Sequence, residues 1–513
     1  MFSSNTKQKY IGILIQSISF FLNALISFVI SPLIITKLGE EVYGFVGLAT
    51  NFVSYIQVFV VGVNTMINRL IIIYLHKEGF KEVSQYLSTV IFYNILLSII
   101  FIPIIIWGVL NITSFLNIPI NSLTDIQILW GFLLLCFIID TIMQPFSTAV
   151  IAKNKFELNT ICEMVGNILK VSIIMFSLYY IGVNVWIIGF GSFIYSIYYN
   201  WSMKHYMKKF YPYVKIALAN IKLKVLKEGF LSGIWITTTK ISQIFTSGLD
   251  LLLANLFLND LSMGILAVAK IIPSFISNFF ISISFLFNPE IYEMYAKSMF
   301  EEMAITLKES MRFLIMISTI PCALLIGFGS NFYNMWLPDQ NSNLLYILSI
   351  LILFNSCFTG PLQPIYQLYT VAGKVKLNSI IMLIYGVLSL FLTYIFLKYF
   401  NGGLYAISGV SLVLSLLFSL LFHAPFGAKI IKKEWWYFYG LLFKSFMLLI
   451  LSSIICSIIN ILINPHTYLQ LFTGFTISGF LCLVIEMLLL FRKEEMVSIA
   501  IIIKNKMKGL RKS

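Results

Sequence analysis

Residues 84–110, SQYLSTVIFYNILLSIIFIPIIIWGVL, decide the fold class of this chain, because the stretch contains no charged residue. A helix needs roughly 20 predominantly apolar residues to cross a bilayer, so this stretch is long enough to span it. Similar runs recur along the 513 residues, of which 59% are hydrophobic and 11% charged, whereas a soluble domain has about 25% charged residues. The sequence therefore predicts an all-α polytopic membrane protein and excludes a soluble cytosolic enzyme, a secreted disulfide-rich domain and a disordered chain.

About fourteen apolar runs are long enough to be transmembrane helices. They lie near residues 10–36, 44–75, 84–110, 126–151, 159–181, 184–203, 229–257, 262–287, 311–329, 343–371, 377–397, 404–427, 435–463 and 467–491. With the N-terminus inside, 28 of the 35 Lys and Arg residues fall in inside segments, and only Lys37 and Lys398 fall outside. Cytoplasmic loops carry such a basic excess, so we expect a multi-pass protein with both termini cytoplasmic. The same excess explains the net charge of +14 without a nucleic-acid partner.

The chain repeats itself weakly at an offset of 220 residues. Leu38-Gly39-Glu40 matches Leu258-Asn259-Asp260, and Gly44 matches Gly264. The offset covers six predicted helices, an even number, so both copies have the same topology and should be related by an axis along the membrane normal. We therefore expect two six-helix lobes that face each other across a central cavity.

The repeat predicts the domain organisation. We expect an N-terminal lobe of six helices, a basic cytoplasmic linker, a second lobe of six helices, two further helices and a basic cytoplasmic tail. The corresponding ranges are 1–203, 204–228, 229–427, 428–492 and 493–513. The linker's basic, amphipathic character suits the inner membrane surface.

No enzymatic, metal or cofactor site is predicted. The chain has no GxxxxGK[ST] phosphate-binding loop and no evident constellation of nucleophile, base and acid. Its six cysteines lie inside apolar runs without CxxC spacing, and its four histidines are scattered. We interpret the cysteines and histidines as structural residues of the helices and not as metal ligands. We also predict that the protein is not an enzyme.

The first predicted hairpin carries a recognisable pattern. Pro32 is followed by the turn Leu38-Gly39-Glu40-Glu41-Val42-Tyr43-Gly44, then by Gly62 and Arg69. Together with the run from Asp250 through Gly264 to Lys270, and with six plus six plus two spans, this pattern resembles the multidrug/oligosaccharidyl-lipid/polysaccharide exporter superfamily. It looks most like the polysaccharide-biosynthesis flippase branch.

That resemblance implies a fold and a function. The fold is two six-helix bundles in a V, as in multidrug (MATE-type) exporters, plus two C-terminal helices. The function is movement of a cell-surface polysaccharide repeat unit, carried on undecaprenyl pyrophosphate, from the inner to the outer leaflet of a bacterial cell membrane by alternating access. The implied setting is capsule or O-antigen synthesis, and the implied partners are membrane lipids, a polysaccharide polymerase and glycosyltransferases.

Basic residues inside the predicted spans are candidates for binding an anionic substrate, because an intramembrane charge costs several kcal/mol unless it is paired or hydrated. Lys240 is the deepest, and its alternative role is a structural ion pair. Lys270 and Arg69 could contact the pyrophosphate or extend to the membrane surface as anchors. Lys37, at the outer end of the first span, could instead mark the interface.

Two acidic residues are candidates for coupling transport to a proton or sodium ion. Asp250 could take up the ion or pair with Lys270. Asp140 could belong to a proton relay or form one buried pair with Lys170, which lies at similar depth on the next predicted span. Glu163 and Glu486 lie close enough to cytoplasmic helix ends that we expect both to be solvated.

Four functions compete at this stage. An oligosaccharide-lipid flippase predicts a cationic cavity, and a lipid II flippase predicts the same. A cation-coupled multidrug exporter predicts an acidic or neutral aromatic cavity. A scaffold for glycan synthesis would use the basic linker but leave the deep charges unexplained. The basic residues Arg69, Lys240 and Lys270 favour a flippase over an exporter.

Overall fold

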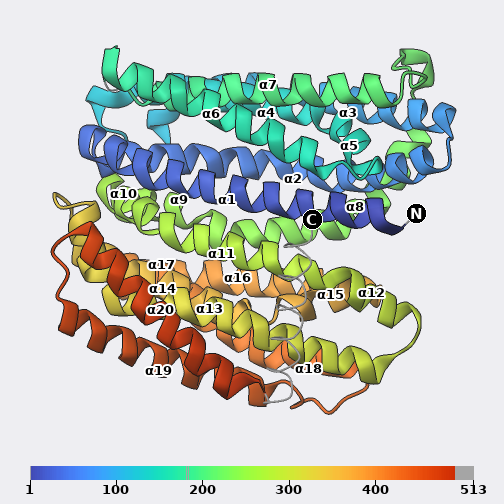
Figure 1. The fold of residues 1–513 in the computed structure, drawn as a ribbon. Helices are drawn as coiled ribbons and strands as arrows, with labels where there is room; N and C mark the ends of the chain where they lie inside the picture. Colours follow the sequence, from blue (N-terminus) through green and yellow to red (C-terminus); the bar gives the residue numbers. More distant parts are fainter. Residues whose placement is uncertain (1, 181, 183, 492–513) are drawn as a thin grey trace. The chain divides into compact units, whose positions relative to one another are not determined.

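The computed structural model describes residues 2–180, 182 and 184–491, and every regular element in these ranges is helical (Figure 1). The predicted tail at 493–513 lies outside the described residues. The helices pack as two units, of which the first comprises Met1–Val268 with Met382–Asn401 and the second comprises Ala269–Ile381 with Gly402–Ser513. The units group the residues that pack together, whichever copy of the repeat they belong to. The lobe boundaries expected from the repeat therefore stay a prediction.

The helices of the first unit are α1 (Phe2–Leu38), α2 (Glu40–His76), α3 (Phe80–Leu110), α4 (Leu123–Met143), α5 (Thr148–Ala152), α6 (Phe156–Tyr180), α7 (Trp186–Phe210), α8 (Leu223–Gln243), α9 (Asp250–Phe257), α10 (Asp260–Ala269) and most of α16 (Val375–Tyr399). Those of the second are α11 (Ile271–Ser284), α12 (Asn288–Ala296), α13 (Phe300–Trp336), α14 (Ser342–Thr359), α15 (Gln363–Val371), α17 (Gly403–Phe418), α18 (Ala424–Ile430), α19 (Tyr439–Ile463) and α20 (Tyr468–Leu490).

Within the described ranges, twelve helical segments are long and apolar enough to cross a membrane. The all-α polytopic fold is therefore confirmed, whereas the count of fourteen is not. The two predicted spans outside the twelve are occupied by α7 and by α8 with α9. Helix α7 is rich in Tyr and Ser and ends in several lysines, and α8 carries three lysines and is separated from α9 by a π-helical turn, η5 (Ile244–Gly248).

Helix α2 organises the first unit through close contacts at glycine. A Cβ atom on Gly233 of α8 would lie 2.4 Å from the carbonyl oxygen of Gly62 on α2. A Cβ atom on Gly264 of α10 would lie 2.3 Å from the carbonyl oxygen of Glu40. Small residues allow membrane helices to approach backbone to backbone, so these positions set how closely α2 meets α8 and α10.

The second of these contacts joins the two copies of the repeat. A Cβ atom on Gly44 would lie 2.9 Å from the Cα atom of Gly264, its counterpart at the 220-residue offset. In a two-fold arrangement, equivalent residues touch each other only near the symmetry axis. The equivalent turns of the two repeat copies therefore touch at Gly44 and Gly264, and the two-lobe arrangement itself stays a prediction.

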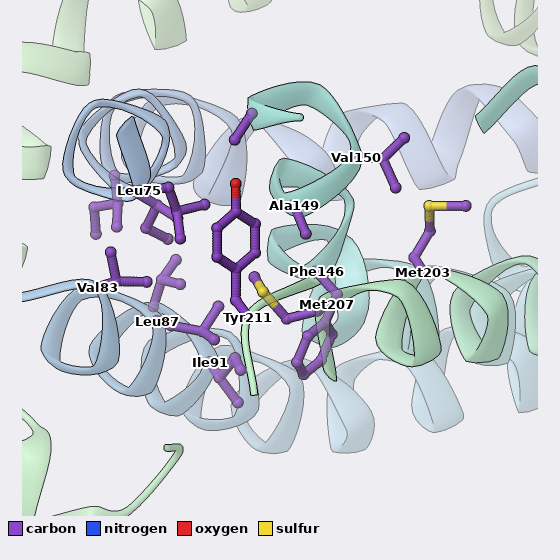
Figure 2. Packing of buried hydrophobic residues seen from close by; sticks show 14 of the residues in the cluster. Leu75, Val83, Leu87, Ile91, Phe146, Ala149, Val150, Met203, Met207 and Tyr211 are labelled. Carbon is purple, nitrogen blue, oxygen red and sulfur yellow. The ribbon is translucent and has the colours of Figure 1, made fainter. Parts of the chain in front are cut away.

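The predicted linker is held against the first unit. Three of its backbone N–H groups, those of Lys215, Ala217 and Lys222, donate to the hydroxyl groups of Ser84, Ser88 and Thr89 on α3 at 3.0 to 3.2 Å. Figure 2 shows the ring of Tyr211, at the start of this segment, between Leu87 of α3 and Ala149 of α5. The segment is thus attached to α3 through its backbone, and its contact with the inner membrane surface stays a prediction.

The second unit is built around α13, which packs against α14, α19 and α20. Glu486 on α20 is fully buried and accepts hydrogen bonds from Thr319 of α13 at 2.8 Å and Ser452 of α19 at 2.7 Å. The expectation that Glu486 is solvated is wrong, because α13 and α19 cover this turn of α20. The carboxyl group instead joins the last two helices to the rest of the unit.

Replacing Gly233 by alanine should lower the melting temperature of the purified protein. The new methyl group would collide with the backbone of α2, and overpacking of this kind costs about 1–3 kcal/mol. Gly131→Ala on α4 is the matched control, because no atom lies within 4 Å of its added Cβ. Thermal unfolding in detergent should separate the two variants, and equal melting temperatures would contradict the backbone contact.

Candidate functional site

Lys240 and Asp250 flank the break between α8 and α9. Lys240 lies in the last turn of α8, Asp250 begins α9, and the π-helical turn η5 lies between them. The hydroxyl group of Tyr55 on α2 donates to the carbonyl oxygen of Gly248 at 2.7 Å, at the end of that turn. Single π-helical turns are frequent at functional sites, so this break, one of two in the described residues with Ser419–His423, supports the predicted lysine as a candidate.

Arg69 and Lys240 lie at different depths on one pair of helices. Helices α2 and α8 are antiparallel and cross where Gly62 meets Gly233. Arg69 is seven residues beyond this crossing in one direction and Lys240 seven residues beyond it in the other, which separates them by about 21 Å along the axis at 1.5 Å per residue. The two side chains therefore cannot hold one pyrophosphate at the same moment.

The other predicted basic residues are elsewhere. Lys37 is exposed in the last turn of α1. Lys270 is half-buried at the junction of α10 and α11 and belongs to the second unit. Within the first unit, then, the structure brings Arg69 and Lys240 onto the same helix pair without placing the predicted set around a single pocket.

A row of polar residues that the sequence analysis missed runs along α6. Asn159, Glu163, Asn167 and Lys170, which we call the polar seam, are spaced at four, four and three residues and so lie on one face of the helix. Asn159 donates to Glu163 at 2.6 Å, and Asn167 donates to Asn23 of α1 at 2.9 Å. The helical spacing itself was the signal that could have revealed it.

Asp140 meets this seam from α4. Its Oδ1 atom accepts hydrogen bonds from Ser196 at 2.5 Å and Asn200 at 2.6 Å, both on α7. Asp140 and Glu163 line a cavity of about 200 Å³, which we call the acidic cavity. Its other lining residues are Met143, Gln144, Ser147, Tyr195, Tyr199, Asn200 and Met203.

The expected buried pair between Asp140 and Lys170 is absent from the described part of the chain. Their helices, α4 and α6, both pack against α7, and a hydroxyl and an amide of α7 bind the carboxylate instead. An oxygen-lined cavity with two carboxyl groups can hold a proton or a small cation, because hydroxyl, amide and carboxylate oxygens are suitable partners for both. In the described residues no group of three or more His, Cys, Asp and Glu side chains could hold a metal ion.

Comparison with known proteins gives consistent results for family and fold. A family described as polysaccharide biosynthesis protein matches residues 11–294. An uncharacterized membrane protein, EpsK of Bacillus subtilis (strain 168), is 22% identical over 483 residues, which cover 93% of this chain and 94% of the relative.

Solved structures show the same fold at low sequence identity. The lipid II flippase MurJ in an inward closed conformation has a TM-score of 0.66 at 15% identity, with 92% of this chain and 98% of MurJ covered. An inward-facing multidrug resistance MATE transporter of the MOP superfamily has a TM-score of 0.64 at 14% identity, with 82% of this chain and 98% of the transporter covered. These structures show the same fold, and the match over residues 11–294 confirms the predicted resemblance to the polysaccharide-biosynthesis family.

The contacts of Asp140 predict how two substitutions should differ. Asp140→Asn keeps an acceptor for both Ser196 and Asn200, so its melting temperature should stay close to that of the wild type. Asp140→Leu removes the acceptor of the Ser196 hydroxyl and leaves the Asn200 amide with its bonds to Ser196 alone, and an unsatisfied buried donor costs about 1–3 kcal/mol. Thermal unfolding of the two purified variants tests this difference, and an unchanged leucine variant would exclude the observed hydrogen bonds.

Proposed function

We propose that this chain, which belongs to the polysaccharide biosynthesis protein family, flips an oligosaccharide carried on undecaprenyl pyrophosphate from the inner to the outer leaflet of a bacterial cell membrane. The observation that carries the proposal is the half-buried Lys240 beside the π-helical turn of α8 and α9. Its ammonium group is the point charge that an anionic headgroup needs within the span. The proposed setting is synthesis of a capsule or O-antigen, with both termini cytoplasmic and a polymerase and glycosyltransferases as partners.

The separation of the basic residues supports a stepwise path. Arg69 is exposed near the end of α2 that we assign to the cytoplasm, so it is placed to meet the entering pyrophosphate. Lys240 is about 21 Å further along the α2 and α8 pair, close to the distance a headgroup travels to mid-membrane. We assign Lys270 and Lys37 to later contacts, on the outer side.

Asp140 and Asp250 are the proposed coupling residues. Asp140 shares the acidic cavity with Glu163, and one of its oxygens is already oriented by Ser196 and Asn200. A proton or sodium ion bound there would remove negative charge from the first unit. Asp250 follows the π-helical turn directly and so is placed to respond to occupancy near Lys240.

A lipid II flippase is the second candidate, because the chain resembles MurJ over 92% of its length. A lipid II carrier also presents a pyrophosphate, so the same basic residues would serve it. A cation-coupled multidrug exporter is less well supported, since it has no use for a lysine at the π-helical turn.

The decisive experiment measures flipping in proteoliposomes. A short-chain polyprenyl-pyrophosphate oligosaccharide and lipid II are supplied in parallel, and passage between leaflets is compared for the wild type, Lys240→Ala and Lys444→Ala at equal protein amounts. Lys444 is an exposed lysine of α19 and serves as the matched control. Loss of the charged contact at Lys240 should slow flipping at least about tenfold, while the control flips normally.

The contrary outcomes are distinct. Normal flipping by Lys240→Ala would contradict the role of Lys240 in binding the pyrophosphate but would leave the flippase function standing. Preference for lipid II would select the second candidate. A wild type that flips neither lipid but extrudes an organic cation would overturn the proposed function.

A further inference from the structure

Lys170 lies in a pocket that the proposed transport path does not use. The pocket has a volume of about 360 Å³ and is formed by α1, α2, α6 and α7 of the first unit. Its polar lining, which we call the lysine pocket, consists of Asn23, Ser27, Ser31, Tyr43, Asn167 and Lys170. The rest of its wall is aliphatic.

Two helices supply the polar lining at helical spacing. Asn23, Ser27 and Ser31 repeat every four residues, so they form one stripe along α1. Asn167 and Lys170 are one turn apart on α6, and the Asn167 amide donates to Asn23 across the pocket at 2.9 Å. Ser27 is exposed, so the pocket is open at that edge.

The ammonium group of Lys170 has no acidic partner in the described part of the chain. The nearest acid of its own helix that faces the same side, Glu163, is seven residues away, which is about 10 Å along α6. Gly191 lets α7 pack on the stem of the lysine, because an added Cβ would lie 3.3 Å from its Cγ atom. An ammonium group held in a span without a counter-ion is costly, and an anionic ligand would offset that cost.

The composition of the pocket selects among anions. It offers one cation together with two amides and three hydroxyl groups, all able to bind neutral hydroxyls. A pyrophosphate offers only acceptor oxygens, whereas the amide and hydroxyl oxygens of this lining can also accept, so a ligand with hydroxyl donors uses more of the lining. A single carboxylate on a ring of hydroxyl groups matches the lining better.

We propose that the lysine pocket binds an acidic sugar residue, with the carboxylate on Lys170 and the sugar hydroxyls on Asn23, Asn167 and the serines. The inference rests on the proposed function only for the source of the sugar, which would be the glycan of the flipped lipid. The pocket would then make the first unit selective for glycans that contain a uronic acid.

The test is a binding measurement that needs no transport. Purified full-length protein in nanodiscs is titrated with sodium glucuronate, glucose and inorganic pyrophosphate at equal ionic strength, and binding is followed by thermal shift and ligand-observed NMR. Glucuronate should bind the wild type more tightly than glucose does. Lys170→Met should weaken glucuronate binding at least about tenfold, because a charge-assisted hydrogen bond is lost, and Lys170→Arg should retain part of it.

Two further variants keep the result interpretable. Lys444→Met controls for general loss of positive charge, and Asn167→Leu tests the pocket if Lys170→Met fails to fold. Equal binding of glucuronate by the wild type, Lys170→Met and Asn167→Leu would overturn the proposal, as would pyrophosphate binding that depends on Lys170 more than glucuronate binding does. If glucuronate binds through Lys170 but the wild type flips no lipid, the proposed function falls and the sugar-acid site stands.

Discussion

The close approach of α2 to α8 and α10 is the constraint on which the first unit depends. At both crossings, glycine brings backbone against backbone, and no other residue would leave that space. The crossing of Gly62 with Gly233 fixes the register of α2 and α8, and with it the depths of Arg69 and Lys240. The crossing of Gly44 with Gly264 joins the two copies of the repeat at equivalent residues. The residues proposed to bind the substrate on these helices, Arg69 and Lys240, are therefore positioned by glycines that have no side-chain chemistry of their own.

Polar groups inside the first unit are organised by charge. Along α6, Glu163 belongs to the acidic cavity and Lys170 to the lysine pocket, with Asn167 and its partner Asn23 between them. Opposite charges on one helix face are thus kept in separate compartments by about two helical turns. Such a separation lets a cation and an anionic sugar occupy the same unit without neutralising each other's binding groups.

Sequence reasoning predicted what depends on composition and missed what depends on side-chain partners. Residues 84–110 were enough for the membrane class, which the twelve long apolar helices of the described residues confirm. The partner of Asp140 could not be predicted, because sequence adjacency favours Lys170 on α6, whereas α4 packs against α7 and so meets Ser196 and Asn200. Glu486 was wrongly predicted to be solvated. Its distance from the helix end indicates its depth in the membrane, but not that α13 and α19 bury its side chain. The π-helical turn between Lys240 and Asp250 has no composition signal that distinguishes it from an ordinary apolar turn.

The attachment of the linker to α3 has a consequence for how this family can diversify. Three backbone N–H groups of the linker bind Ser84, Ser88 and Thr89, so the attachment asks for particular side chains on α3 and almost none on the linker itself. Its lysines are thereby free to vary. Substitution of these lysines can change the positive charge of the linker's surface, and with it the attraction to anionic lipids or acidic protein partners. The linker would remain attached to α3 by its backbone.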